Sequence, residues 1–208
     1  MNKQRKNPDI RTEAYKAGSK TLGFIGIGHM GHPIAMRLLN HGHRVVVFDR
    51  DREKAAELVS HGATAAFVMA DLARDADVIL STLADDRTVL DVYNGPGGVF
   101  ANARPGAVVI EMSTVRPSTS RELYSAGKFR QVDVLDIAIS GSTPAAEAGT
   151  ITLLAGGDQR VFNAVTPIFE AIAKQYFYLG PSGSGTTMKL VANTLLGVGM
   201  RQSPKLLP

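Results

Sequence analysis

Short runs of hydrophobic residues recur along the chain, and longer stretches with helical spacing of apolar residues separate several of them. The short runs are typical of buried strands and the spaced stretches of helices packed against them. Because the two kinds of segment alternate, the pattern predicts an α/β domain with a doubly wound, mostly parallel sheet. Strands are expected at residues 21–25, 44–48, 77–82, 106–112, 131–139, 151–155 and 175–179, and helices from Met30, at 51–61, from Pro117, at 158–173 and at 186–200.

The first strand leads into the loop Gly-Ile-Gly-His-Met-Gly and then into a helix. Gly26 would allow the tight turn, Gly28 would let the backbone approach a pyrophosphate, and Gly31 would let the helix pack close to the sheet. The helix that begins near Met30 points its N-terminal N–H groups toward bound phosphates. His29 is expected to contribute its backbone N–H rather than its ring.

The second strand ends in Asp49, where a carboxylate can accept hydrogen bonds from the ribose hydroxyls of an adenosine. Glycine spacing alone arises by chance, but here strand, loop, helix, strand and acid follow in order. The sequence therefore predicts a Rossmann-type dinucleotide site. Asp49 favours NAD, because a carboxylate repels the 2′-phosphate of NADP, whereas Arg50 and Arg52 weaken that preference.

Composition narrows the class of protein further. The 208 residues are 44% hydrophobic and 20% charged, which is ordinary for a globular domain. The chain has no cysteine and no histidines at metal-ligand spacing, so we expect no metal site. No apolar run reaches the ~18 residues of a membrane-spanning helix, and no signal peptide is visible, so we expect a cytoplasmic protein without a membrane partner.

The net charge of +4 is concentrated at the N-terminus, where residues 1–20 hold six basic residues and two acidic ones. This segment is expected to be a solvated, disordered basic extension. A nucleic-acid-binding arm is the alternative, but no recognition module accompanies it, so no nucleic-acid partner is expected.

The helix at residues 186–200 is apolar on nearly every face except for Lys189 and Asn193. These two residues are four positions apart and lie on one side of a helix. Burial would favour a neutral lysine that acts as a general base. Alternatively, Lys189 extends along its own stem to solvent, and the helix alone leaves both interpretations open.

Four sequence blocks resemble those of the β-hydroxyacid dehydrogenase family, which includes 3-hydroxyisobutyrate dehydrogenase, tartronate semialdehyde reductase and 6-phosphogluconate dehydrogenase. Residues 24–31 are similar to the family's cofactor signature, and residues 112–117 to its Ser-Thr-x-x-Pro block. Residues 136–150 are similar to its substrate block, and residues 183–193 to its lysine block. Together they extend the resemblance over about residues 21–200.

This resemblance implies a role for each matching residue. Lys189 would take the proton from the substrate hydroxyl in oxidation and return it in reduction, and Asn193 would help to orient Lys189 and the substrate. Thr114 would line the nicotinamide end of the cofactor. Ser140 and Gly141 would bind the substrate carboxylate.

Other positions depart from the family pattern. Leu83 matches a cofactor-contacting leucine, but Ala84 stands where the family has proline. Ser142 belongs to the substrate block but replaces its second glycine, which leaves the substrate open. The charged residues 85–87 are expected to form a solvated turn rather than to take part in catalysis.

The implied reaction is hydride transfer between NAD or NADP and a small 3-hydroxy acid or its semialdehyde. Imine reduction is a weaker alternative, because Lys189 suits hydroxyl deprotonation better.

The expected organisation is an N-terminal extension at 1–20, an NAD(P)-binding Rossmann domain at 21–181, the start of an interdomain helix at 182–200 and an atypical tail at 201–208. Family members continue into a helical domain, so the sequence is interpreted as C-terminally truncated. The alternative function is therefore a catalytically impaired NAD-binding module. We expect homo-oligomers to form through the apolar helix 186–200.

Overall fold

The computed structural model describes residue 15 and residues 18–201, with side chains described as far as residue 197. Its centre is a single eight-stranded sheet in the order β3-β2-β1-β4-β5-β6-β7-β8. Every neighbouring pair is parallel except β6 and β7, which are antiparallel. The strands are β1 (Thr21–Ile25), β2 (Arg44–Phe48), β3 (Thr64–Ala65), β4 (Val78–Ser81), β5 (Val108–Glu111), β6 (Asp133–Ser140), β7 (Ile151–Gly156) and β8 (Ala173–Tyr178).

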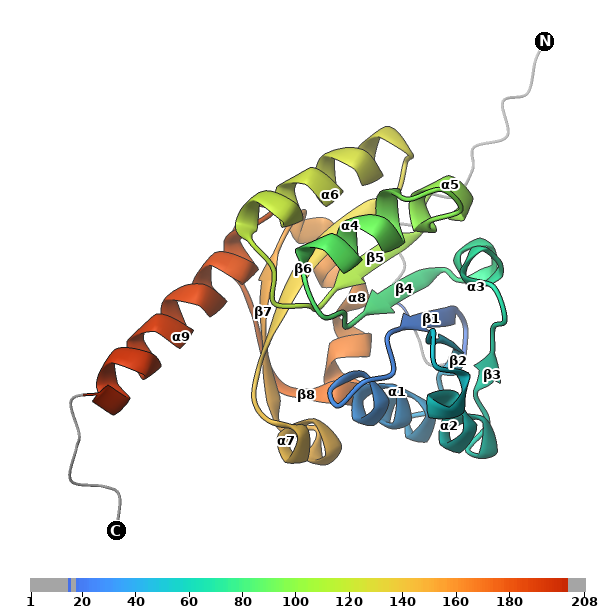
Figure 1. Ribbon diagram of the computed structural model, residues 1–208, viewed down its shortest axis with the longest axis horizontal. Coiled ribbons are helices and arrows are strands. Elements are labelled where there is room, and N and C mark those ends of the chain that lie inside the picture. The colour runs from blue at the N-terminus through green and yellow to red at the C-terminus, as the bar shows by residue number, and fades with distance from the viewer. Residues whose placement is uncertain (1–14, 16–17, 202–208) are drawn as a thin grey trace.

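Helices cover both faces of this sheet (Figure 1). On one face α1 packs against α8, and on the other α5 packs against α3 and α4, with α6 against α4 and α9. The doubly wound, mostly parallel fold predicted from the sequence is confirmed. The helices are α1 (Gly31–Asn40), the 3₁₀ turn η1 (Arg52–Ala55), α2 (Ala56–Ser60), α3 (Met69–Asp75), α4 (Asp86–Asn94), α5 (Val99–Asn102), α6 (Pro117–Phe129), α7 (Thr143–Ala148), α8 (Gln159–Ile172) and α9 (Ser184–Arg201).

The alternation of side chains along each strand explains why the central strands read as runs of mostly apolar residues. Val78 and Leu80 of β4 join the core on the α1 and α8 side, whereas Ile79 between them joins the core on the α3 to α6 side. Strands covered by helices on both faces bury both sets of side chains, so their sequences read as continuous apolar runs. The central strands are therefore rigid supports for the loops that follow them.

The structure differs from the sequence prediction mainly in short helices. Helix α4 begins at Asp86, inside the segment expected to be a solvated turn, so the prediction of a turn is wrong, although Asp85 and Arg87 are exposed as expected. The Asp85 carboxylate caps α4 by accepting a hydrogen bond from Thr88 N (2.7 Å). Asp86 accepts from Arg116 N (2.9 Å) and so joins the starts of α4 and α6.

Two chain segments near the ends also bear on the predicted organisation. Tyr15 is buried, and its N–H donates to Ala164 O (3.1 Å), so ordered contacts begin ahead of residue 21. The remainder of the predicted basic extension up to residue 17 lies outside the described residues, as do residues 202–208 of the predicted tail. None of the described helices is long and apolar enough to cross a membrane.

Candidate functional site

A cavity of about 890 Å³ lies where β1, β2, β4 and β5 end. Parallel strands place their carboxyl ends at one edge of the sheet, and β1 lies between β2 and β4, where the strand order reverses. Ligands of doubly wound sheets bind at this kind of switch point. Ten of the residues singled out in the sequence line the cavity, namely Gly26, Gly28, His29, Met30, Asp49, Arg50, Leu83, Thr114, Gly141 and Lys189.

The glycine loop has a different reason for glycine at each position. Gly26 has φ +90°, a conformation that side chains disfavour. A Cβ at Gly31 would collide with Gly26 O, because α1 starts directly against the loop. A Cβ at Gly28 would meet no atom within 4 Å. The loop therefore packs tightly at Gly26 and Gly31 and leaves open space beside Gly28, at the cavity wall.

The start of α1 is suited to an anion. Its first turn holds no acidic residue, and Met30 before it provides no side-chain cap. The helix dipole and the first N–H groups thus face no competing acid in that turn.

Asp49 is fixed at the end of β2 by backbone donors. Its Oδ2 accepts from Ile27 N (2.7 Å) and its Oδ1 from Asp51 N (2.9 Å), so the carboxylate ties the glycine loop to β2. Lys54 Nζ lies 3.8 Å from Oδ1 and also lines the cavity. Together with the α1 start and the space at Gly28, these groups fit the phosphates and adenosine ribose of a dinucleotide.

The loops after β4 and β5 are joined at the other end of the cavity. Leu83 N donates to Ser113 Oγ (2.7 Å), and Ser113 N donates to Glu111 Oε1 (2.9 Å). Thr114, next to Ser113, is exposed at the cavity wall. The position of Thr114 thus depends on the buried carboxyl group of Glu111.

Glu111 is 2% exposed at the end of β5. Burial raises the pKa of its carboxyl to about 7, although hydrogen bonds from Ser113 act to lower it. Its Oε2 has no hydrogen-bond partner among the described residues.

Helix α9 brings Lys189 to the same cavity, which Thr114 and Gly141 also line. The chain enters α9 through Gly183, whose N–H donates to Asp136 Oδ1 of β6 (2.7 Å). Lys189 is far from the glycine loop along the chain. The folded sheet brings both to the same cavity.

Four predicted site residues do not line the cavity. Gly31 lies behind the loop, where it contacts Gly26 O. Ser140 pairs with Thr152 at the end of β6, and Ser142 precedes α7. Asn193 lies one turn beyond Lys189 on α9 and is exposed.

Sequence reasoning missed several lining residues. Lys54 and Met69 line the cavity, although the segments that carry them show no motif. Ser113 belongs to the second of the four sequence blocks, but the sequence does not show its hydrogen bond with Leu83. An acidic residue at the end of the apolar run 106–111 was the available signal for Glu111. Among the described residues, no group of three histidines or acids could hold a metal ion.

Comparisons with known proteins agree on one family. Residues 21–180 match the family described as the NAD binding domain of 6-phosphogluconate dehydrogenase. The chain is 39% identical over 184 residues to a probable mitochondrial 3-hydroxyisobutyrate dehydrogenase of Dictyostelium discoideum, covering 88% of this chain and 57% of that protein. It is also 39% identical over 181 residues to an NAD-dependent L-serine dehydrogenase of Pseudomonas aeruginosa, covering 87% and 61%.

A solved structure shows the same architecture. The 3-hydroxyisobutyrate dehydrogenase of Mycobacterium tuberculosis with L-serine superposes with a TM-score of 0.82 at 29% identity, covering 86% of this chain and 60% of that one. The chain thus spans about three fifths of the length of the proteins it matches. Imine reductases 20–22% identical to this chain share the fold.

Proposed function

Because this chain belongs to the β-hydroxyacid dehydrogenase family, we propose that it is part of an oxidoreductase that acts on a small 3-hydroxy acid or the matching semialdehyde. The observation that carries this proposal is the cavity itself. Lys189 of α9 lines it together with the glycine loop and Thr114, although these elements are far apart in the sequence. A cofactor site and a side chain that can exchange a proton therefore share one space.

The chain carries an NAD-binding domain, and we propose that NAD is preferred over NADP. Gly28 and the start of α1 would receive the pyrophosphate, and Asp49 would accept hydrogen bonds from the ribose hydroxyls. Arg50 and Lys54 beside Asp49 reduce the repulsion of a 2′-phosphate, so NADP would bind less well rather than not at all.

Lys189 would act as the general acid and base. In the oxidation, its neutral amine accepts the proton of the substrate hydroxyl; in the reduction, its ammonium group returns that proton to the carbonyl oxygen. A bound nicotinamide supplies the hydride acceptor for the oxidation and, when reduced, the hydride donor for the reverse reaction. Asn193, one turn further along α9, would orient the substrate or Lys189.

The loop after β6 and the names of the relatives support the proposed substrate class. Gly141 lies at the cavity wall with φ +150°, and its backbone and that of Ser140 and Ser142 would bind a carboxylate. The named relatives act on 3-hydroxyisobutyrate and L-serine, each of which has a carboxylate and a hydroxyl on the β-carbon. This pairing suits a carboxylate site near a proton-exchanging lysine.

The experiment compares cofactor binding with turnover in three forms of the chain: unchanged, Lys189→Ala and Lys174→Ala. Lys174 does not line the cavity, so its variant controls for loss of a lysine. We expect all three to bind NADH equally. We expect Lys189→Ala to oxidise 3-hydroxyisobutyrate or L-serine about 10²-fold or more slowly than the other two. Equal NADH binding with no turnover in any form would instead favour the catalytically impaired module.

We also propose a cytoplasmic location and a homo-oligomer formed through the apolar helix 186–200. Fractionation of cells that express the full protein tests the location.

A further inference from the structure

A buried acid outside the cavity holds the helix that carries Lys189. Asp136 lies within β6, is 2% exposed and does not line the cavity. Acidic side chains are almost never fully buried unless they are paired. The partners of Asp136 therefore indicate why an acid stands in the buried middle of β6, between Leu135 and Ile137.

These partners are backbone N–H groups at the start of α9. Asp136 Oδ1 accepts from Gly183 N (2.7 Å), and Oδ2 accepts from Thr186 N (3.1 Å). Gly183 directly precedes the helix and Thr186 is its third residue, so these are donors that lack partners within the helix. In a capping box two side chains of the helix itself satisfy such donors. Here one carboxylate from a distant strand satisfies both.

The surroundings are shaped to admit this carboxylate. A Cβ at Gly156 of β7 would lie 2.6 Å from Asp136 Oδ1, so only glycine leaves the necessary room. A Cβ at Gly185 would lie 2.7 Å from Asp136 O, so the first turn of α9 rests directly on the backbone of β6. Ser120 Oγ of α6 lies 3.3 Å from Thr186 Oγ1 and supports the turn from the other side.

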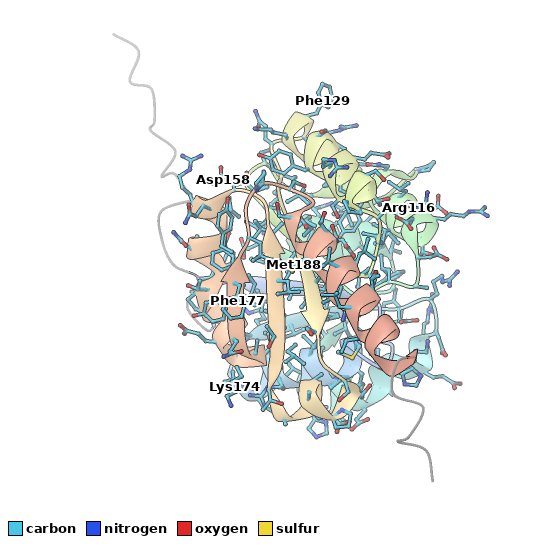
Figure 2. The ribbon with its side chains drawn as sticks, turned by 90° about the vertical axis from the view of Figure 1, so that its left-hand side faces the viewer. Arg116, Phe129, Asp158, Lys174, Phe177 and Met188 are labelled. Atoms are coloured by element: carbon cyan, nitrogen blue, oxygen red, sulfur yellow. The ribbon has the colours of Figure 1, made fainter. Side chains whose placement is uncertain are left out.

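The rest of α9 has far less support. Leu195 and Leu196 are each 67% exposed, and α9 extends away from the sheet beyond its first turns (Figure 1). Met188 lies on its outward side (Figure 2). A helix held at one end takes its direction from that end. Lys189 is five residues after the helix start, within about 8 Å along its axis, so the anchored turn determines where its side chain lies.

The carboxylate also suits its place electrostatically. A negative charge at a helix N-terminus is stabilised by the helix dipole and by charge-assisted hydrogen bonds. Burial raises the pKa of the Asp136 carboxyl above its ordinary value, and the N–H groups of Gly183 and Thr186 act in the opposite direction. Its neighbour in register on β5, Glu111, is the other buried acid at this edge.

We propose that Asp136 is a positioning residue, which orients α9 through Gly183 and Thr186 and thereby places Lys189 in the cavity. This role rests on the proposed function only in so far as Lys189 is the group that exchanges the proton.

Amide hydrogen exchange on the full chain tests the anchoring without any turnover. In the unchanged chain, the amides of Gly183 and Thr186 should be more protected than those near Leu195. In Asp136→Asn, these two amides should exchange about tenfold or more faster, while β1 and β2 stay unchanged. Asp133→Asn, on the same strand away from α9, is the control and should leave both amides protected. Equal exchange of the first turn and Leu195 in the unchanged chain would overturn the proposal even if Asp136→Asn does not fold.

Turnover tests the consequence for Lys189. Asp136→Asn should lower kcat about 10²-fold with little change in the affinity for NADH, because the cofactor loops are untouched. The double variant Asp136→Asn/Lys189→Ala should be no slower than Lys189→Ala alone, because a misplaced lysine and an absent one are equivalent. A general loss of stability would make the two effects multiply, and that result would refute a positioning role. No turnover in the unchanged chain would count against the proposed function alone, since hydrogen exchange still decides the anchoring.

Discussion

Glu111 and Asp136 lie side by side on β5 and β6, and backbone N–H groups support their charged forms to different extents. Asp136 accepts from two backbone N–H groups, which favour its charged form. Glu111 accepts from one backbone N–H and has an oxygen without a partner among the described residues. Two adjacent buried carboxylates repel each other, so the neutral form of Glu111 is the favoured partner of a charged Asp136.

The raised pKa of Glu111 makes stability depend on pH. The carboxyl has an ordinary pKa of 4.5 and a pKa of about 7 in the folded chain. Between these values the folded state binds more protons than the unfolded state, so the free energy of unfolding falls as pH rises. We expect the ionisation of Glu111 to lower the free energy of unfolding by about 3 kcal/mol across this pH range. Above the range, Glu111 should cause no further decline.

Urea denaturation from about pH 5 to about pH 8 checks this expectation. Glu111→Gln should lack this part of the decline, whereas Glu122→Gln, at an exposed position on α6, should retain it. The same pH slope in Glu111→Gln as in the unchanged chain would show that Glu111 does not hold a proton.

Asp49 provides a second residue-scale prediction. Asp49→Asn replaces a carboxylate that accepts from Ile27 N and Asp51 N, so both the glycine loop and the ribose site should weaken. We expect NADH to bind about tenfold more weakly and the preference over NADPH to shrink. Isothermal titration with both cofactors measures this; Asp71→Asn, whose side chain is 57% exposed, is the control. An unchanged ratio of the two affinities would contradict the assigned role.

The position of Asp49 at the cavity could be predicted because its motif is local: strand, loop, helix, strand and acid follow one another between residues 21 and 49. The roles of Glu111 and Asp136 were not predictable in this way. Asp136 bonds to Gly183 and Thr186, which are 47 and 50 positions away, and no spacing rule connects a strand acid with a helix start at that separation. Such partners become visible only once the sheet fixes β6 beneath α9.

At the scale of elements, the glycine loop and α1 offer a matched pair of substitutions. A Cβ at Gly31 would collide with Gly26 O, whereas a Cβ at Gly28 would meet nothing. We expect Gly31→Ala to lower the free energy of unfolding by about 1–3 kcal/mol. Gly28→Ala should fold as the unchanged chain does but lose NADH binding, because its methyl group takes the space proposed for the pyrophosphate. Thermal unfolding with and without NADH separates the loss of stability from the loss of cofactor binding. If Gly28→Ala bound NADH as tightly as the unchanged chain, the proposed pyrophosphate position would be wrong.

The elements that could be predicted are those with long apolar patterns. Continuous apolar runs predict the buried strands, although β8 begins at Ala173, which is the last residue of the expected helix 158–173. The missed elements are short, namely β3, α3, α4, α5 and α7. Helices of one or two turns have little stability of their own and form because neighbouring elements cover them. Their sequences therefore carry a weak signal, apart from a cap such as Asp85.

At the scale of the whole molecule, one sheet edge carries every group of the candidate site. Parallel strands deliver the glycine loop, Asp49, Leu83 and Thr114 to that edge, and β6 delivers Asp136 beneath α9. The cavity is thus composite, with its cofactor end built on the first half of the sheet. Its lysine end depends on a helix held through its first turn.

The outer part of that helix leads to the last prediction. Exposed apolar side chains gather on α9, including Met188, Val191, Leu195 and Leu196. A contiguous apolar surface in water tends to be covered by association. We expect the chain to self-associate through α9 at tens of micromolar, which light scattering or sedimentation would detect.

Substitution tests whether α9 is the contact. The double variant Leu195→Glu/Leu196→Glu should be monomeric, because two charges would have to be buried in the contact. Phe129→Glu removes an 84% exposed apolar side chain at the end of α6 and should leave the association unchanged. Neither double-variant position lines the cavity, so NADH binding should survive in the monomer. A monomeric unchanged chain would show that the exposed face of α9 does not drive association on its own.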